Sequence, residues 1–229
     1  MSGLCRGGAY MKENQPNRRR RKSDQVLVWF DLEFTSLNLE RAHLLQAALL
    51  VTDTHLRRIG RPQDDVICAV RLPPRARISP WVRENLADLV ESCRSPEAVS
   101  PAELDRLLAA RLDRIVGPPS AEVTCRPVLA GNSIHADWHL ARRLLPVFSS
   151  RLHYRHLDVT SFKLHWDAAG SREAFDKTNP ADVRRWFPSA VIPPESHEHN
   201  AYFDVQASIA ELAFYRARLL RPPRRVSVR

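Results

Sequence analysis

Asp31 and Glu33 are the first residues whose types and spacing suggest chemistry, because they flank one leucine at the end of an apolar run. Alternate residues of a strand point to the same face, so the two carboxylates would project together. Carboxylates that close repel each other and stay ionised when a cation neutralises them. The pair predicts a site for a cation with oxygen ligands, such as Mg²⁺ or Mn²⁺. Taken alone, it leaves open a helix N-cap beside a surface acid.

Two later segments supply further candidate groups. Residues 131–137 follow a predicted strand and open a helix, which puts Asp137 at the carboxyl edge of a sheet, where ligands of α/β proteins bind. His199 and Asp204 lie five residues apart in the first turns of the last predicted helix, so both could reach one cleft. Histidine exchanges a proton near neutral pH, which makes His199 the candidate general base beside a phosphate.

Four other histidines are interpreted as decoys: His135, His139, His153 and His197. His153 and Asp158 repeat the spacing of five residues, but they fall in a predicted strand, where odd spacing sends their side chains to opposite faces. The histidines beside Asp137 are interpreted as surface or hydrogen-bonded groups.

The elements that must position these residues alternate along the chain. Strands are predicted at residues 26–33, 44–52, 66–72, 127–130 and 155–159. Helices are predicted at residues 79–92, 100–116, 136–145, 159–166 and 199–220, and residues 170–195 are predicted to form a loop with one short helix. This order predicts an α/β fold with a mixed central sheet flanked by helices.

The charge of the chain is concentrated at its two ends. The net charge is +9, of which residues 1–22 carry +6 and residues 216–229 another +6, so the middle carries −3. Basic runs are usually solvated tails, and they also hold polyanions. We expect a basic, disordered arm at residues 1–24, one domain at residues 25–220 and a basic tail at residues 221–229.

The composition excludes several classes of protein. Hydrophobic residues make up 44% and charged residues 27%, which is the balance of a globular domain. The apolar stretches are too short to cross a bilayer, and the N-terminus lacks the apolar segment of a secretory signal, so we expect a cytoplasmic protein with no membrane partner. The cysteines have no C-x-x-C spacing, which argues against a zinc finger or a redox motif: Cys5, Cys68, Cys93 and Cys125.

Taken together, the candidate residues resemble the catalytic set of the DEDDh 3′→5′ exonucleases: Asp31, Glu33, Asp137, His199 and Asp204. Within that group the chain most resembles the oligoribonucleases. The similarity covers about residues 25–220, through the segments VWFDLEFTSL (28–37), LLVTD (49–53), GNSIH (131–135), HYRHLDV (153–159) and residues 204–216, in the family's order.

The resemblance implies a ribonuclease H-like fold and a two-metal mechanism. The four carboxylates would hold two Mg²⁺ or Mn²⁺ ions, and His199 would deprotonate the attacking water. The implied substrate is short single-stranded RNA, cut from the 3′ end to 5′-mononucleotides, with single-stranded DNA as a further possibility. The family also implies a homodimer.

The resemblance assigns substrate contacts to six more residues: Leu37, Trp81, Ser133, Tyr154, Arg155 and Thr160. Leu37 and Trp81 would contact bases, although plain packing remains the alternative for both. Ser133, Arg155 and Thr160 would cap the 5′ phosphate, for which an arginine fork is well shaped. Tyr154 would lie near the site across the dimer interface.

The chain departs from the family at several positions. Gln46 stands where the family usually has a glutamate, Ser36 stands where it has a glycine, and the segments after Trp81 and at residues 170–195 differ. Two alternatives stay open. One is a broader DEDDh exonuclease that trims longer RNA or single-stranded DNA held by the basic arms, and the other is a non-catalytic nucleic-acid-binding protein. Preference for substrate length and metal-stimulated turnover would separate the three.

Overall fold

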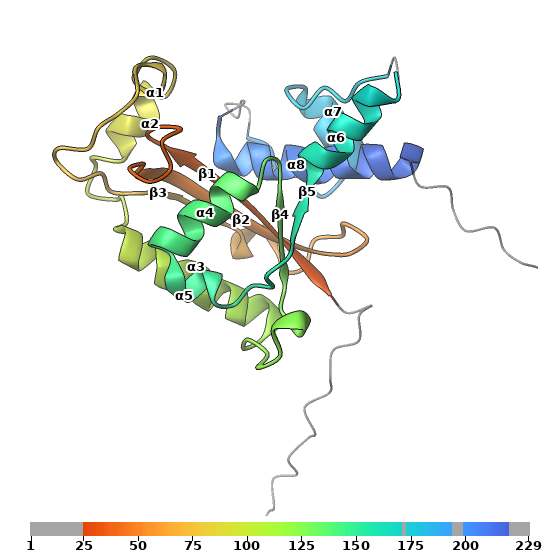
Figure 1. Ribbon diagram of the computed structural model, residues 1–229, viewed down its shortest axis with the longest axis horizontal. Coiled ribbons are helices and arrows are strands. Elements are labelled where there is room, and N and C mark those ends of the chain that lie inside the picture. Colours follow the sequence, from red (N-terminus) through yellow and green to blue (C-terminus); the bar gives the residue numbers. More distant parts are fainter. Residues whose placement is uncertain (1–24, 171–172, 194–198, 220–229) are drawn as a thin grey trace, which may run out of the picture.

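A mixed sheet of five strands forms the centre of the protein, in the order β3-β2-β1-β4-β5 (Figure 1). The computed structural model describes residues 25–170, 173–193 and 199–219. The strands are β1 (Val26–Phe34), β2 (Leu44–Asp53), β3 (Val66–Ala69), β4 (Val128–Gly131) and β5 (His156–Asp158). β1 pairs with β2 antiparallel and with β4 parallel. The predicted α/β fold with a mixed sheet is confirmed.

Helices cover both faces of this sheet (Figure 1). The α-helices are α1 (Pro80–Asn85), α2 (Ala87–Ser92), α3 (Pro101–Val116), α4 (His135–Leu144), α5 (Pro146–Ser149), α6 (Val159–Ala168), α7 (Pro180–Trp186) and α8 (Ala201–Leu219), and two short 3-10 helices are η2 (Pro62–Asp64) and η3 (Val123–Cys125). Ser79, Ser100 and Asn179 each accept a backbone N–H of a helix that begins with proline, so capping defines these starts.

The alternation of side chains along β1 separates two cores. Val28 and Phe30 pack with α3, α4 and α5 on one face of the sheet. Leu27 and Trp29 pack with α6, α7 and α8 on the other face. Alternate residues of a strand share a face, so the odd-numbered side chains of β1 point toward α8 along the whole strand, including its carboxyl end. This is where the predicted acidic pair lies.

Some predicted boundaries were wrong, for identifiable reasons. The helix predicted at residues 79–92 is broken at Leu86, whose side chain is buried with Leu45 and Leu72 in a small separate core. The third strand ends at Ala69 instead of residue 72: the N–H of Val70 still donates to Leu45 of β2, but Val70 also bridges to Val99, and the N–H of Arg71 donates to Val99.

Two further corrections concern residues singled out in the sequence. The fifth strand begins at His156, so His153 precedes it and does not share a strand with Asp158. His153 takes part in a local turn instead, in which its Nδ1 accepts the backbone N–H of Arg155 at 2.8 Å. The last helix begins at Ala201, so His199 stands before its first turn instead of within it.

The basic arm at residues 1–24, the tail at residues 221–229 and His197 lie outside the described residues. The proposed division into arm, domain and tail therefore stays a prediction. None of the helices in the described ranges is long and apolar enough to cross a membrane.

Candidate active site

β1 brings two carboxylates to the face of the sheet that α8 covers. Asp31 and Glu33 follow Leu27 and Trp29 on that face, and Glu33 lies opposite Gln46 of β2. β4 pairs with β1 only as far as Trp29. The carboxyl end of β1 therefore lacks a neighbour on its β4 side, and this gap opens the site.

Asp137 fills part of that gap from the first turn of α4. Its Oδ1 accepts the backbone N–H of Leu32 at 2.9 Å, a group that no β4 residue reaches. The approach depends on Gly131, because a Cβ there would lie 2.9 Å from the carbonyl oxygen of Phe30. The tight β4–β1 contact thus places the Asp137 carboxylate beside that of Asp31.

The remaining two groups come from the start of α8: His199 lies just before the helix and Asp204 lies in its first turn. Asn200 caps the helix through the N–H groups of Tyr202 and Phe203, and Gln46 accepts the N–H of Ala201 at 2.8 Å. His199 has a φ of 68°, in the left-handed region, and its backbone N–H donates to Asp204 Oδ2 at 2.9 Å. Gln46 therefore anchors the start of the helix that presents these groups.

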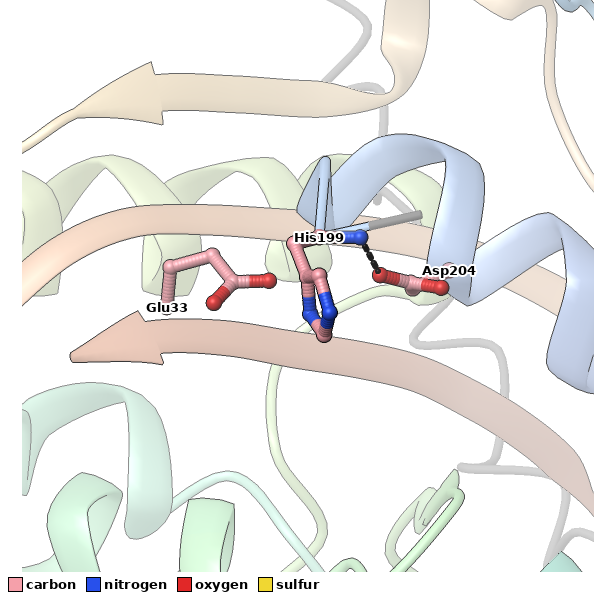
Figure 2. Close-up of side chains that lie close together, drawn as sticks. All are labelled: Glu33, His199 and Asp204. Carbon is pink, nitrogen blue, oxygen red and sulfur yellow. Dashed lines mark hydrogen bonds between the residues drawn. The ribbon is translucent and has the colours of Figure 1, made fainter. Parts of the chain in front are cut away.

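The five predicted catalytic residues line a single cleft of about 250 Å³. Its lining is Asp31, Leu32, Glu33, Phe34, Asn132, Ser133, Ala136, Asp137, Lys177, His199, Asp204 and Ser208. Figure 2 shows the His199 ring between the carboxylates of Glu33 and Asp204. One ligand atom from each of these three residues lies within 4.8 Å of the other two.

The carboxylates of the cleft are costly to ionise together. Burial raises the pKa of Asp31 to about 8, and the Asp204 carboxylate adds to this while Lys177 opposes it. Burial raises the pKa of Glu33 to about 9, with further contributions from Asp31 and Asp204. Burial and Asp31 raise the pKa of Asp137 well above its ordinary range, against the N–H of Leu32.

This donor set fits divalent cations. Without a counter-charge, crowded and buried carboxylates retain their protons. A cation bound between them stabilises their ionised form. Oxygen ligands with room for water and phosphate suit Mg²⁺ and Mn²⁺. A carboxylate and histidine cluster able to bind a divalent metal is therefore present, formed by Glu33 of β1, by His199 and by Asp204 of α8.

A second group of polar residues borders the cleft at the starts of α4 and α6. Ser133 has a φ of 47°, and its N–H donates to Asp158 Oδ1 at 3.0 Å and to Thr160 Oγ1 at 2.8 Å. Asp158 also caps α6 through the N–H of Thr160. Asn132 donates to Ser208 and Glu211 of α8, at 3.0 and 2.8 Å. Ser133 and Thr160, both predicted to contact phosphate, are thus adjacent.

Of the predicted substrate contacts, Ser133 lines the cleft, and the others lie outside its lining: Leu37, Trp81, Tyr154, Arg155 and Thr160. The Trp81 ring meets the His199 ring edge-on, with centroids 4.9 Å apart, and the N–H of Ser79 donates to the carbonyl of Thr35, which fixes α1 beside β1. Leu37 is 90% exposed on the connection from β1 to β2. Tyr154 is exposed and stacks on His153, and the Arg155 guanidinium lies 5.4 Å from the Tyr154 ring centre.

The structure adds cleft residues that the sequence reasoning missed, notably Lys177, Asn132 and Ser208. Asn132 belongs to the GNSIH segment and could have been found there. Lys177 had no motif to mark it. The decoy histidines of the described part, His135, His139 and His153, do not line the cleft.

Comparison with known proteins places this geometry in a family. The exonuclease family (RNase_T) matches residues 28–212. An oligoribonuclease of Nocardia farcinica is 30% identical over 85% of this chain and 81% of its own length. An oligoribonuclease of Mycobacterium ulcerans is 33% identical over 84% and 80%, and a mitochondrial oligoribonuclease of Bos taurus is 29% identical over 93% and 79%.

Solved structures show the same fold. Exonuclease I from Methylocaldum szegediense matches with a TM-score of 0.60 at 17% identity, over 85% of this chain, and this chain spans only 41% of that protein. Cell-death related nuclease 4 matches with a TM-score of 0.55 at 15% identity. The fold is thus that of ribonuclease H-like exonucleases. The chain belongs to the exonuclease family and, within it, to the oligoribonucleases, and is a 3′–5′ exonuclease.

Proposed function

We propose that this protein degrades short single-stranded oligoribonucleotides from the 3′ end and releases 5′-mononucleotides. One observation carries the proposal: β1, α4 and α8 bring four carboxylates and one histidine into a single cleft. The relatives named oligoribonuclease support the choice of short RNA as the substrate.

The four carboxylates are proposed to hold two Mg²⁺ or Mn²⁺ ions: Asp31, Glu33, Asp137 and Asp204. When bound, two such ions stabilise the charge that develops on the entering and leaving oxygens of an in-line displacement. The raised pKa values of Asp31 and Glu33 support this assignment, because such groups gain most from a neighbouring cation.

His199 is proposed as the general base that takes a proton from the attacking water. Its ring lies beside the carboxylates of Glu33 and Asp204, and Trp81 packs edge-on against it. Its backbone N–H donates to Asp204, which fixes the residue relative to the acidic cluster. A base held in this way needs little reorganisation before it accepts the proton.

The substrate residues are proposed to act on either side of this centre. Leu37 and Trp81 would contact bases, because both side chains have large exposed apolar surfaces near the carboxyl end of β1. Ser133 and Thr160 would meet the 5′ phosphate at the corner held by Asp158. Arg155 would join them, and Tyr154 would act across a homodimer interface.

We also propose a homodimer and a location in the cytoplasm. The large exposed side chain of Tyr154 supports a shared interface, and the bacterial relatives support the cytoplasm, although the bovine relative is mitochondrial. Light scattering of the purified protein tests the first proposal, and cell fractionation tests the second. A monomer at micromolar concentration would contradict the dimer.

A cleavage time course tests the proposed function. The substrates are 5′-labelled RNAs of two, seven and twenty nucleotides and a matching DNA, each with Mn²⁺, and Asp204→Ala serves as the blank. We expect the dinucleotide to be cut fastest and Asp204→Ala to be inactive. Preference for the longest RNA or for DNA would indicate the broader exonuclease, and equal activity of Asp204→Ala would refute the mechanism.

A further inference from the structure

Lys177 places a positive charge in a cleft otherwise defined by carboxylates. Its side chain is half-buried and lines the same cleft as Asp31, Glu33 and His199. Its charge lowers the pKa of both Asp31 and Glu33, against the effect of burial, so it acts on the acidic cluster. Lys177 lies in the connection between α6 and α7.

The turn that carries Lys177 is anchored on both sides. Before it, Phe175 packs against Phe214 of α8, with ring centres 5.8 Å apart. Across it, Asp176 accepts the N–H and the hydroxyl of Thr178, and after it Asn179 caps α7 through the N–H of Ala181. The turn is thus tied to α8 through Phe175 and to α7 through Asn179, and the lysine between these contacts lines the cleft.

The charge balance of the cleft gives this lysine a use. Two divalent cations neutralise four ionised carboxylates. Without Lys177, the metal-loaded cleft would therefore have no net positive charge to attract an incoming phosphodiester. Each phosphodiester brings a negative charge, and the transition state of its hydrolysis concentrates charge on the non-bridging oxygens. An ammonium group is a compact partner for such an oxygen.

We propose that Lys177 contacts a non-bridging oxygen of the scissile phosphate and stabilises the charge that develops there during cleavage. This inference rests on the proposed function and adds a substrate-contacting residue to it. With metal held by Asp31, Glu33, Asp137 and Asp204, the Lys177 ammonium would add one further positive charge to the cleft that receives the phosphate. Its role is electrostatic, so it neither gives up nor accepts a proton.

The chain offers a matched control for this role. Lys163 and Lys177 are the lysines of the described ranges, and all other basic side chains there besides histidine are arginines. Lys163 lies on the exposed side of α6 and pairs with Asp167 at 3.6 Å, away from the cleft. Lys177→Met and Lys163→Met therefore remove the same charge from the protein, one inside the site and one outside it.

The test compares the full-length wild type with Lys177→Met, Lys177→Arg and Lys163→Met. We measure kcat and KM on the dinucleotide at saturating Mn²⁺, Mn²⁺ affinity by calorimetry, and RNA affinity in Ca²⁺ under conditions without cleavage. We expect Lys177→Met to lower kcat by about 100-fold and RNA affinity by about tenfold, with Mn²⁺ affinity unchanged or higher. Lys177→Arg should recover part of both losses, and Lys163→Met should match the wild type.

Two results would overturn the proposal. One is a Lys177→Met variant with the kcat and RNA affinity of Lys163→Met, which would mean that the lysine only balances the metal-free carboxylates. The other is a loss explained by weaker Mn²⁺ binding or a lower Tm. A failure of the proposed function looks different, since the wild type itself would then show no Mn²⁺-dependent cleavage of the dinucleotide, while the RNA-binding comparison would still decide the role of Lys177.

Discussion

Asp105 and Asp137 are equally buried, each 5% exposed, yet hydrogen-bond donors surround the first carboxylate and other carboxylates surround the second. Asp105 of α3 accepts two backbone N–H groups at the start of α5, from Val147 at 3.0 Å and Phe148 at 2.7 Å. Asp137 of α4 accepts the backbone N–H of Leu32, but burial and the carboxylates of Asp31 and Glu33 raise its pKa. The charge of Asp105 is stabilised by backbone hydrogen bonds, whereas the charge of Asp137 is destabilised by neighbouring carboxylates.

The difference separates structural acids from functional acids in this chain. A buried carboxylate with matched donors stabilises the local backbone, whereas one crowded by like charges destabilises it until a cation arrives. Burial alone therefore does not identify a catalytic group. The groups next to a buried carboxylate decide whether it is structural or functional. Four predictions test this statement, ordered from the largest expected effect to the smallest.

Asp137→Asn should abolish activity and preserve the fold. The amide keeps an acceptor for the N–H of Leu32 but removes a charge that a metal needs, so we expect kcat to fall by about 1,000-fold or more. In EDTA the Tm should stay equal to that of the wild type or rise, because repulsion with Asp31 is relieved. A variant with a clearly lower Tm would show that Asp137 is structural like Asp105.

The metal-free protein should lose stability as pH rises. The pKa of Asp31 is raised to about 8 and that of Glu33 to about 9, so between about pH 4.5 and these values the folded chain binds more protons than the unfolded chain. Stability from this source is greatest at acidic pH and declines through neutral pH. Melts in EDTA at about pH 6 and about pH 8.5 should differ by several degrees.

Saturating Mn²⁺ should reverse that trend, because metal binding favours the deprotonated carboxylates and strengthens as pH rises. An Asp31→Asn, Glu33→Gln double variant is the control, and its melts in EDTA should depend less on pH. Identical pH profiles for this variant and the wild type would assign the effect to other groups.

Asp105→Asn should lower stability and leave chemistry intact. An amide has one oxygen where the carboxylate uses two, so one N–H at the start of α5 loses its partner, at a cost of about 1–3 kcal/mol. For a chain of this size that is roughly 2–4 °C in Tm per kcal/mol. Activity per folded molecule, measured well below Tm, should match that of the wild type, and a selective loss of kcat would break the contrast with Asp137.

Gln46 supports the start of a helix, as Asp105 does, and lies beside the acidic cleft, as Asp137 does. Its side chain is uncharged, and its variants should show the smallest effects. Gln46→Met removes the acceptor for the N–H of Ala201 and should cost about 1 kcal/mol. Gln46→Glu retains an acceptor at the N-terminus of α8, where a negative charge is favoured, but it also places a carboxylate opposite Glu33, so its Tm in EDTA should lie between those of Gln46→Met and the wild type. Urea denaturation curves of both variants give the comparison, and a more damaging Gln46→Glu would contradict it.

Much of the site followed from local rules in the sequence. Strand alternation predicts that Asp31 and Glu33 share a face, and the strand-to-helix position of Asp137 predicts its place at the sheet edge. The capped starts at Ser79 and Ser100 also follow from local chemistry. In each case the decisive neighbours lie within a few positions along the chain.

The rest depends on contacts between distant segments. Lys177 lines the cleft in a segment where Phe175 packs on Phe214, a contact between residues far apart in the sequence that no local pattern encodes. The break at Leu86 reflects burial against Leu45 rather than helix propensity. His199 has a left-handed backbone conformation just before the helix, and its N–H donates to Asp204. The spacing of five residues therefore predicted the correct location of His199, although the helical geometry assumed for it was wrong.

The contact between Trp81 and His199 also gives the protein an intrinsic optical signal. Trp81 is half-exposed beside the cleft, whereas Trp29 is fully buried in the core below α8. Indole emission responds to the charge of an adjacent imidazole and to the polarity around it. Substrate or metal arriving at His199 should therefore change the fluorescence of Trp81 and leave that of Trp29 almost constant, so occupancy of the cleft can be followed in real time without a label.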